Sequence, residues 1–82
     1  MNKTSAEISE WLIARIAHYA ETAPENVDVD SDIATFRLDS LIMVNITAEL
    51  EEWLEMEVNP TLLWEMRTIA ASAEWIVENQ EA

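Results

Sequence analysis

The sequence predicts a small all-α protein, a bundle of three main helices and one short helix with a long loop between the first two. Two observations favour this fold class. Large apolar residues recur at intervals of three and four in separate segments. No segment shows the sustained apolar and polar alternation that is typical of a strand. The 82 residues, 1–82, are expected to form a single domain.

The first helix is predicted over roughly residues 5–21. Thr4 and Glu7 have the spacing of a capping box, in which the side chain of each residue accepts a hydrogen bond from the backbone N–H of the other. Pro24 cannot continue a helix, so the element ends before it. The predicted buried face consists of Ile8, Trp11, Leu12, Ile16 and Tyr19.

Residues 22–39 are predicted to form a long loop. Its aspartates and Ser31 favour turns over helix. Loops of this length are uncommon in compact domains and usually have a function. We expect this loop to pack against the core, because it contains the large apolar residues Val27, Ile33, Phe36 and Leu38.

The second helix begins at Asp39 or Ser40, since both residue types cap helices. Asn59-Pro60 is another start signal, with proline at the first helical position, and a short helix, LLWEM, follows. Thr68 is expected to cap a last helix. The predicted apolar stripe of the second helix is Leu41, Val44, Thr47, Leu50 and Leu54, and that of the last helix is Ile69, Ala73, Ile76 and Val77.

The composition limits the classes of partner. The chain has 17 acidic and four basic residues and a formal net charge of −13, which repels nucleic acid and anionic membranes and favours partners with basic faces. No segment approaches the roughly 20 apolar residues of a membrane span. There is no cysteine, so no disulfide framework or thiolate metal site is expected. The N-terminus has no apolar leader, so we expect a cytoplasmic protein.

The stretch DVDSDIATFRLD, residues 28–39, has part of the pattern of an EF-hand calcium loop. Its first three aspartates and Asp39 stand at ligand positions 1, 3, 5 and 12 of such a loop. Position 6, which requires glycine, is Ile33, and the chain contains no glycine. We therefore expect no metal site here, apart from weak, nonspecific binding of divalent cations.

Ser40 is the candidate functional residue. At a helix N-terminus it would face unpaired backbone N–H groups and the positive end of the helix dipole, which stabilise a phosphate ester. Asp39-Ser40 alone is more typical of a plain helix cap than of a modification site.

The surroundings of Ser40 point to a particular family. Residues 33–58, IATFRLDSLIMVNITAELEEWLEMEV, and residues 59–76, NPTLLWEMRTIAASAEWI, resemble the acyl carrier protein family, including the carrier domains of polyketide synthases. The second segment is similar to the proline-threonine-leucine-leucine helix and the threonine-isoleucine helix start of polyketide-type carriers. The resemblance implies a four-helix bundle of acyl-carrier type.

The resemblance also implies a function. The chain would be a stand-alone acyl carrier protein, not an enzyme, with 4′-phosphopantetheine on Ser40. The arm's thiol would carry acyl groups as thioesters in polyketide or specialised fatty-acid biosynthesis. The implied partners are a phosphopantetheinyl transferase, an acyl-loading ligase or acyltransferase, a ketosynthase and other acyl-processing enzymes. We expect the carrier to be a monomer.

The same resemblance assigns roles by position. Asp39 would assist recognition by the transferase, and Leu41 and Val44 would be apolar contacts beside the arm. Ala48 would lie one turn further along the helix.

Acidic residues lower on the same helix would contact partners. Glu51 and Glu52 are the implied contacts, although a solvated helix face explains them equally well. The implied core residues are Ile33, Phe36, Leu38, Leu50, Leu54, Val58, Trp64, Ile69 and Ile76.

The chain departs from the family at several positions. Arg37 stands where glycine is common, so a positive φ there would cost on the order of 1 kcal/mol, and its cation lies next to the future phosphate. Ile42 and Asn45 replace acidic residues of many bacterial fatty-acid carriers. Arg67 replaces a common proline, and Ser72 replaces a usual core leucine, with Trp75 as possible compensation.

Two other functions stay open. One is a peptidyl or aminoacyl carrier of nonribosomal peptide synthesis. The second is an acidic helical interaction module that uses Trp53 or Trp75 as its binding face. A hydrolase at Ser40 is disfavoured, since the only histidine, His18, is expected to be a surface residue and no glycine is present to build a nucleophile elbow.

Overall fold

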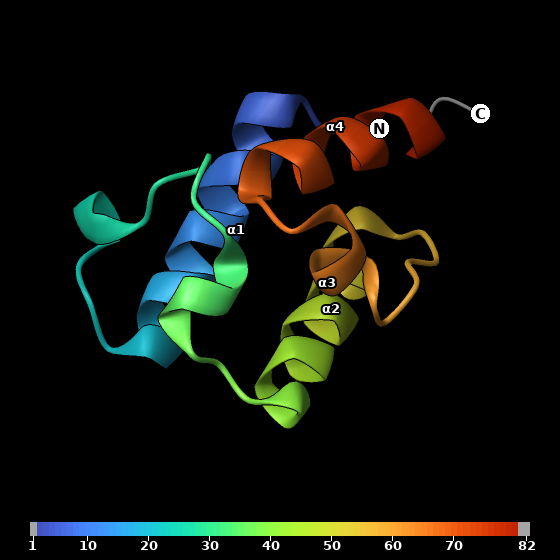
Figure 1. Ribbon diagram of the computed structural model, residues 1–82. Helices are drawn as coiled ribbons and strands as arrows, with labels where there is room; N and C mark the ends of the chain where they lie inside the picture. The colour runs from blue at the N-terminus through green and yellow to red at the C-terminus, as the bar shows by residue number, and fades with distance from the viewer. Residues whose placement is uncertain (1, 81–82) are drawn as a thin grey trace.

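The computed structural model describes residues 2–80 and confirms the all-α fold (Figure 1). Its elements are α1 (Ser5–Ala20), η1 (Pro24–Asn26), η2 (Ile33–Phe36), α2 (Ser40–Leu54), α3 (Leu62–Met66) and α4 (Ile69–Gln80), where η marks a short 3₁₀ helix. Within the described part, the only β-type pairing is an isolated bridge between Asp32 and Thr68. None of the described helices is both long enough and apolar enough to cross a membrane.

Helix α1 begins as the sequence predicts. The Thr4 hydroxyl accepts a hydrogen bond from the Glu7 N–H, and the Glu7 carboxylate accepts one from the Thr4 N–H. The hydrogen bond from the Thr4 N–H to the Glu7 carboxylate lowers the pKa of Glu7 most, and the Thr4 hydroxyl beside that carboxylate lowers it further. The helix ends at a left-handed Glu21 (φ 55°), and Pro24 instead begins η1. The end of α1 is therefore made by a left-handed cap ahead of the proline.

Helix α1 makes its most extensive helix contacts with α4, and Figure 1 shows α4 beside the N-terminal part of α1. At the C-terminal end of α4, the Gln80 side chain hydrogen-bonds the backbone of Lys3, just before α1 begins. Burial of apolar surface between the helices is the main stabilising term. The buried hydrophobic residues are Ile8, Leu12, Ile16, Ala17, Val27, Ile33, Met43, Ile46, Leu50, Val58, Leu62, Leu63, Ile69, Ala73 and Ile76.

The predicted apolar stripe of α2 is wrong at its N-terminal end. Leu41 and Val44 are 69% and 40% exposed, and the buried face consists of Met43, Ile46, Thr47 and Leu50. The helix contains more apolar residues than one face can hold, so periodicity alone could not select the buried set. Thr47 is tolerated inside because its hydroxyl donates a 2.9 Å hydrogen bond to the Met43 carbonyl.

The predicted short helix LLWEM is confirmed as α3, but the helical position of Pro60 and the burial of Trp64 were predicted wrongly. The helix begins at Leu62, two residues after Pro60, because Asn59 and Pro60 belong to a turn in which the Leu62 N–H donates to the Asn59 carbonyl. Trp64 was expected in the core and is 42% exposed. In a helix of a single turn the core takes Leu62 and Leu63, so the next residue faces outward.

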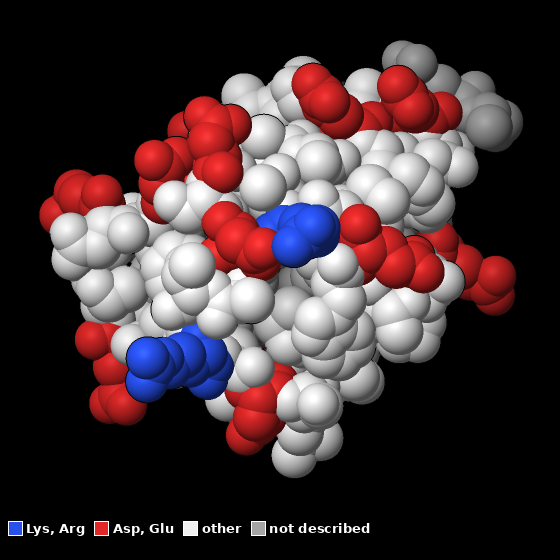
Figure 2. All heavy atoms as spheres, in the orientation of Figure 1, with Lys and Arg blue, Asp and Glu red and all other residues white. Residues whose placement is uncertain are grey.

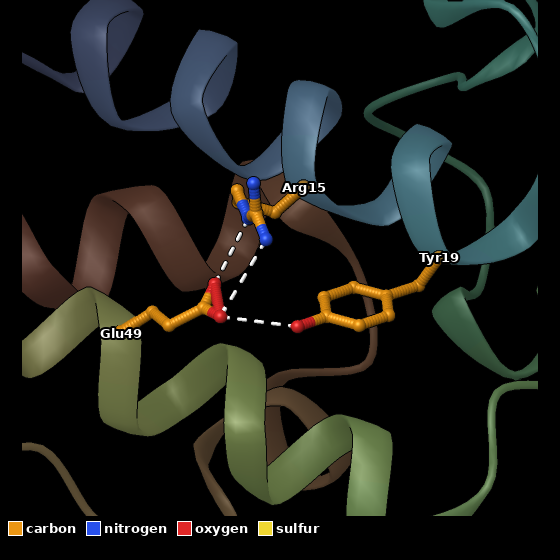
Figure 3. Close-up of polar contacts among 3 residues, drawn as sticks. All are labelled: Arg15, Tyr19 and Glu49. Atoms are coloured by element: carbon orange, nitrogen blue, oxygen red, sulfur yellow. Dashed lines mark hydrogen bonds and ion pairs between the residues drawn. The ribbon is translucent and has the colours of Figure 1, made fainter.

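A polar cluster joins α1 to α2 (Figure 3). Arg15 Nε lies 2.9 Å from a carboxylate oxygen of Glu49, and the Tyr19 hydroxyl donates to the other oxygen at 3.0 Å. The Tyr19 hydroxyl contributes most to raising the pKa of Arg15, and the Glu49 carboxylate adds to the effect. Each group is partly exposed, so the cluster contributes little to stability.

Hydrogen bonds hold the long loop onto the junction between α3 and α4. The Ile33 N–H donates to the Arg67 carbonyl at 2.7 Å, and the Ala70 N–H donates to the Val29 carbonyl at 3.0 Å. The Ile33 side chain is buried, as predicted, while Phe36 and Leu38 pack on the core in part. The loop therefore leads into α2 from a fixed position.

The tryptophans named for an interaction module do not form an open face. Trp53 stacks on Trp11 with ring centroids 5.4 Å apart, and the Lys3 ammonium lies 4.8 Å from the Trp53 ring. Trp53 and Trp75 are both half-buried against the core. The replacement of leucine by Ser72 is satisfied locally, because the buried Ser72 hydroxyl donates to the Thr68 carbonyl at 2.8 Å.

Candidate functional site

Ser40 is the first residue of α2 and is exposed. The N-cap of the helix is Asp39, whose side chain accepts a 2.9 Å hydrogen bond from the Ile42 N–H. The structure thus separates two roles that the sequence left open. Asp39 closes the helix end, and the Ser40 hydroxyl is not the cap. An exposed hydroxyl beside a helix N-terminus fits attachment of an anionic group.

Replacing Asp39 tests the division of roles between the two residues. Asp39→Ala is expected to lower the free energy of unfolding by about 1 kcal/mol, because it removes the side-chain oxygen that caps α2. Asp39→Asn keeps a capping oxygen and is expected to change it by much less. Urea unfolding monitored by tryptophan fluorescence measures both. Equal losses for Ala and Asn would mean that the charge, and not the cap, matters.

An exposed apolar strip follows Ser40 along α2. Leu41, Val44 and Ala48 are all exposed and lie three and four residues apart, which places them on one face of the helix. Exposure is what a role as partner contacts would require of these residues. Burial of large apolar residues is the usual outcome, so exposure of Leu41 and Val44 next to Ser40 indicates a contact surface.

The acidic residues of α2 divide into two kinds. Glu51 is half-buried, and its carboxylate accepts a 2.8 Å hydrogen bond from the Val58 N–H, which holds the chain after α2 against the helix. Glu52 is exposed. Glu51 therefore has an internal structural task that spacing along the sequence did not reveal, whereas Glu52 is available to a partner.

The aspartates of the long loop make local hydrogen bonds. Asp28 accepts one from the Asp30 N–H, and Asp32 accepts one from the Ala34 N–H at the start of η2. Asp32 also lies 3.5 Å from Arg67 Nε. Within residues 2–80, no group of three or more acidic or histidine side chains is gathered as metal ligands.

Arg37 lies three residues before Ser40 and is exposed. Its backbone has φ 54° and ψ 38°. This is the left-handed conformation that glycine, common at this position in the family, adopts without strain. The Arg37 N–H donates to the Ala34 carbonyl and ends η2. Glycine is not needed for such turns in this chain, since Glu21, Glu55 and Arg67 also have positive φ.

The surface carries the charge that the composition predicts. Acidic side chains are spread over the face seen in Figure 2, with only small basic areas between them. His18 is exposed in the last turn of α1, where its ring packs edge-on against Tyr19. The exposed Trp64 on α3 is a surface feature that sequence reasoning missed.

Comparison with known families agrees with this site. A family model described as "Phosphopantetheine attachment site" matches residues 10–76, which include Ser40 and both apolar contacts beside it. That range covers most of the chain.

Individual relatives are of the same kind. The chain is 27% identical to "Acyl carrier protein TtuC" of Teredinibacter turnerae over 73 residues, 89% of this chain and 84% of that protein. It is 23% identical to "Polyketide synthase PksL" of Bacillus subtilis over 92% of this chain, which spans only 2% of that much longer protein. A solved free-standing peptidyl carrier protein from Acinetobacter baumannii superposes with a TM-score of 0.89 and 33% identity, covering 96% of this chain and 99% of that one.

Proposed function

This chain belongs to the phosphopantetheine attachment-site family, and we propose that residues 1–82 act as one acyl carrier domain bearing 4′-phosphopantetheine on Ser40. Members of the family are carrier domains that hold this group covalently on a serine and tether substrates without catalysing reactions. The observation that carries the choice of residue is the free, exposed hydroxyl of Ser40 next to a helix cap made by Asp39.

The attachment reaction uses the chain as a nucleophile. The Ser40 oxygen would attack the phosphorus of coenzyme A that bears the pantetheine, forming a new O–P bond as the pyrophosphate P–O bond breaks. Adenosine 3′,5′-bisphosphate leaves, and the hydroxyl proton passes to the transferase or to water. Asp39 leaves Ser40 free for this attack by capping α2 itself.

Once bound to Ser40, 4′-phosphopantetheine supplies a thiol that holds acyl chains as thioesters. The residues around Ser40 then present the loaded arm to enzymes. Leu41, Val44 and Ala48 offer an apolar contact surface beside the attachment point, and Glu52 offers an acidic contact lower on α2. Partners with an apolar rim and basic surroundings fit these residues.

The proposed cargo is an acyl chain of polyketide or specialised fatty-acid biosynthesis. The similarity to TtuC and the net charge of −13 support an acyl carrier. The 33% identity to a peptidyl carrier protein supports a second candidate, a peptidyl or aminoacyl carrier.

Loading assays separate the two candidates. The chain is first converted with coenzyme A and a broad-specificity phosphopantetheinyl transferase, and a mass gain of one phosphopantetheine is expected. The product is then offered to an acyl-adenylate-forming ligase and to an aminoacyl-adenylate-forming enzyme. Faster thioester formation with acyl groups is expected, and faster loading of amino acids would favour the peptidyl carrier. No mass gain at all would contradict both.

Leu41 is predicted to contribute to recognition by the transferase. Leu41→Asp is expected to lower kcat/KM for the attachment reaction roughly 30-fold, the size of one interface hot spot, with little change in stability because the side chain is 69% exposed. The control is Asn45→Asp, which adds the same charge at another exposed position of α2. An equal slowing by both variants would attribute the effect to charge instead of the lost apolar contact.

A further inference from the structure

We propose that the Arg37 guanidinium pairs with the phosphodiester on Ser40 and positions the base of the arm, an inference that rests on the proposed function. Phosphate oxygens are strong acceptors for the guanidinium, whose N–H groups form charge-assisted hydrogen bonds with them. The proposal rests on the position of Arg37, an exposed residue whose backbone N–H bonds to the Ala34 carbonyl, three residues before the exposed Ser40.

Arg37 differs from the other basic residues in its contacts. Within residues 2–80, Arg15 and Arg67 are ion-paired with carboxylates and Lys3 lies over the Trp53 ring. Arg37 takes part in none of the ion pairs or ring contacts found in that range. It is also the only lysine or arginine between Arg15 and Arg67 in the sequence. Its charge is therefore available to an anion beside it.

The negative charge around Ser40 favours an ion pair between Arg37 and the phosphodiester. A phosphodiester adds one negative charge directly after Asp39, in a chain whose net charge is already −13. Like charges at such short range repel each other. Asp39 cannot turn away freely, because its carboxylate caps the Ile42 N–H. Arg37 is the basic residue of the same segment that offsets this repulsion.

The backbone brings Arg37 within reach of Ser40. Three residues of extended chain span at most about 11 Å, so the Arg37 side chain and the phosphorylated Ser40 side chain only have to cover this distance together. Both sides of the connection are held: the Arg37 N–H bonds to the Ala34 carbonyl, and Leu38 packs against the core. Little backbone entropy is lost when the pair forms, because the segment is already ordered.

The test compares unmodified and phosphopantetheinylated protein. Wild type, Arg37→Ala and Arg37→Lys are prepared in both forms, and mass spectrometry first verifies complete conversion. The matched control is Arg67→Ala, an exposed arginine that also has positive φ but is paired with Asp32. The readouts are the ¹⁵N–¹H resonance of the Arg37 side-chain Nε–H and the ³¹P resonance of the phosphodiester, at low salt and in 1 M salt.

In wild type, conversion is expected to move the Arg37 Nε–H resonance, and high salt is expected to move it back. At low salt the ³¹P resonance should differ between wild type and Arg37→Ala, should be retained in part by Arg37→Lys, and should be unchanged in Arg67→Ala. The unfolding constant of the phosphopantetheinylated protein is divided by that of the unmodified protein. This ratio should be about two- to fivefold higher in Arg37→Ala than in wild type, the effect of losing an exposed ion pair.

Two results would overturn the proposal, and they are distinguishable. Full conversion with an unmoved Arg37 resonance and the same ³¹P resonance in Arg37→Ala would remove the ion pair and leave the carrier function intact. A wild-type chain that gains no mass would remove the carrier function and the pair together.

Discussion

Replacing Ser40 by alanine is expected to abolish attachment of phosphopantetheine completely and to leave the fold unchanged. The reaction needs the hydroxyl oxygen, for which alanine has no substitute. The fold does not need it, because Asp39 supplies the cap of α2 and Ser40 is exposed. Intact mass after incubation with coenzyme A and the transferase measures the first effect, and urea unfolding measures the second.

Ser5→Ala is the matched control for this experiment. Ser5 is the exposed first residue of α1 and follows the N-cap Thr4, so it has the same local position in its helix as Ser40 has in α2. It lacks the exposed apolar strip that follows Ser40. The Ser5→Ala variant should react like wild type. A mass gain that survives Ser40→Ala, or that disappears in Ser5→Ala, would contradict the assignment.

Ile33→Ala is expected to give the largest loss of stability tied to the site, about 2–5 kcal/mol, because it leaves a cavity where a 1% exposed side chain joins the loop to the core. A domain of this kind has a total stability of only about 5–15 kcal/mol. The loop leads directly to Ser40, so loosening it should also slow the transferase reaction while the protein is still folded. Urea unfolding and the rate of mass gain at low temperature measure the two effects.

Leu12→Ala provides the comparison for Ile33→Ala. Leu12 is fully buried in α1, so its truncation should cost a similar free energy without touching the loop. We expect the two variants to be similarly destabilised, with a slower transferase reaction only in Ile33→Ala. Equal reaction rates in the two folded variants would show that the loop does not need Ile33 in order to present Ser40.

Much of the fold follows from local chemistry in the sequence. Thr4 and Glu7 predicted the start of α1, and Thr68 caps α4 as expected, since its hydroxyl accepts from the Ala71 N–H at 3.1 Å. Asp39-Ser40 predicted the start of α2 because capping depends on only a few consecutive residues. The apolar residue Ile33 predicted that the loop is held against the core.

The errors occur where several apolar residues compete for one buried face. Leu41 and Val44 fit a helical stripe as well as Met43 and Ile46 do, and only tertiary packing decided which pair is buried. Trp64 faces outward because the two leucines before it occupy the core. Glu51 bonds the Val58 N–H, a contact set by how the chain turns after α2, which no spacing rule predicts.

The resemblance contributed what periodicity could not. It selected Leu41 and Val44 as contacts beside an attachment site, and their exposure agrees with that role. It also drew attention to Arg37, whose left-handed backbone is the conformation that glycine would favour. Residue patterns alone would have left Ser40 as a plain helix cap, whereas the structure gives that task to Asp39.

The most direct test is to locate the added group on the converted wild-type protein. Trypsin cleaves after Arg37 and Arg67, and the peptide of residues 38–67 contains Ser40 as its only serine. Tandem mass spectrometry of the digest is expected to find one phosphopantetheine on this peptide, with fragment ions that place it on Ser40. The account would be contradicted by a wild-type chain that gains no mass, or by the group appearing on any other peptide.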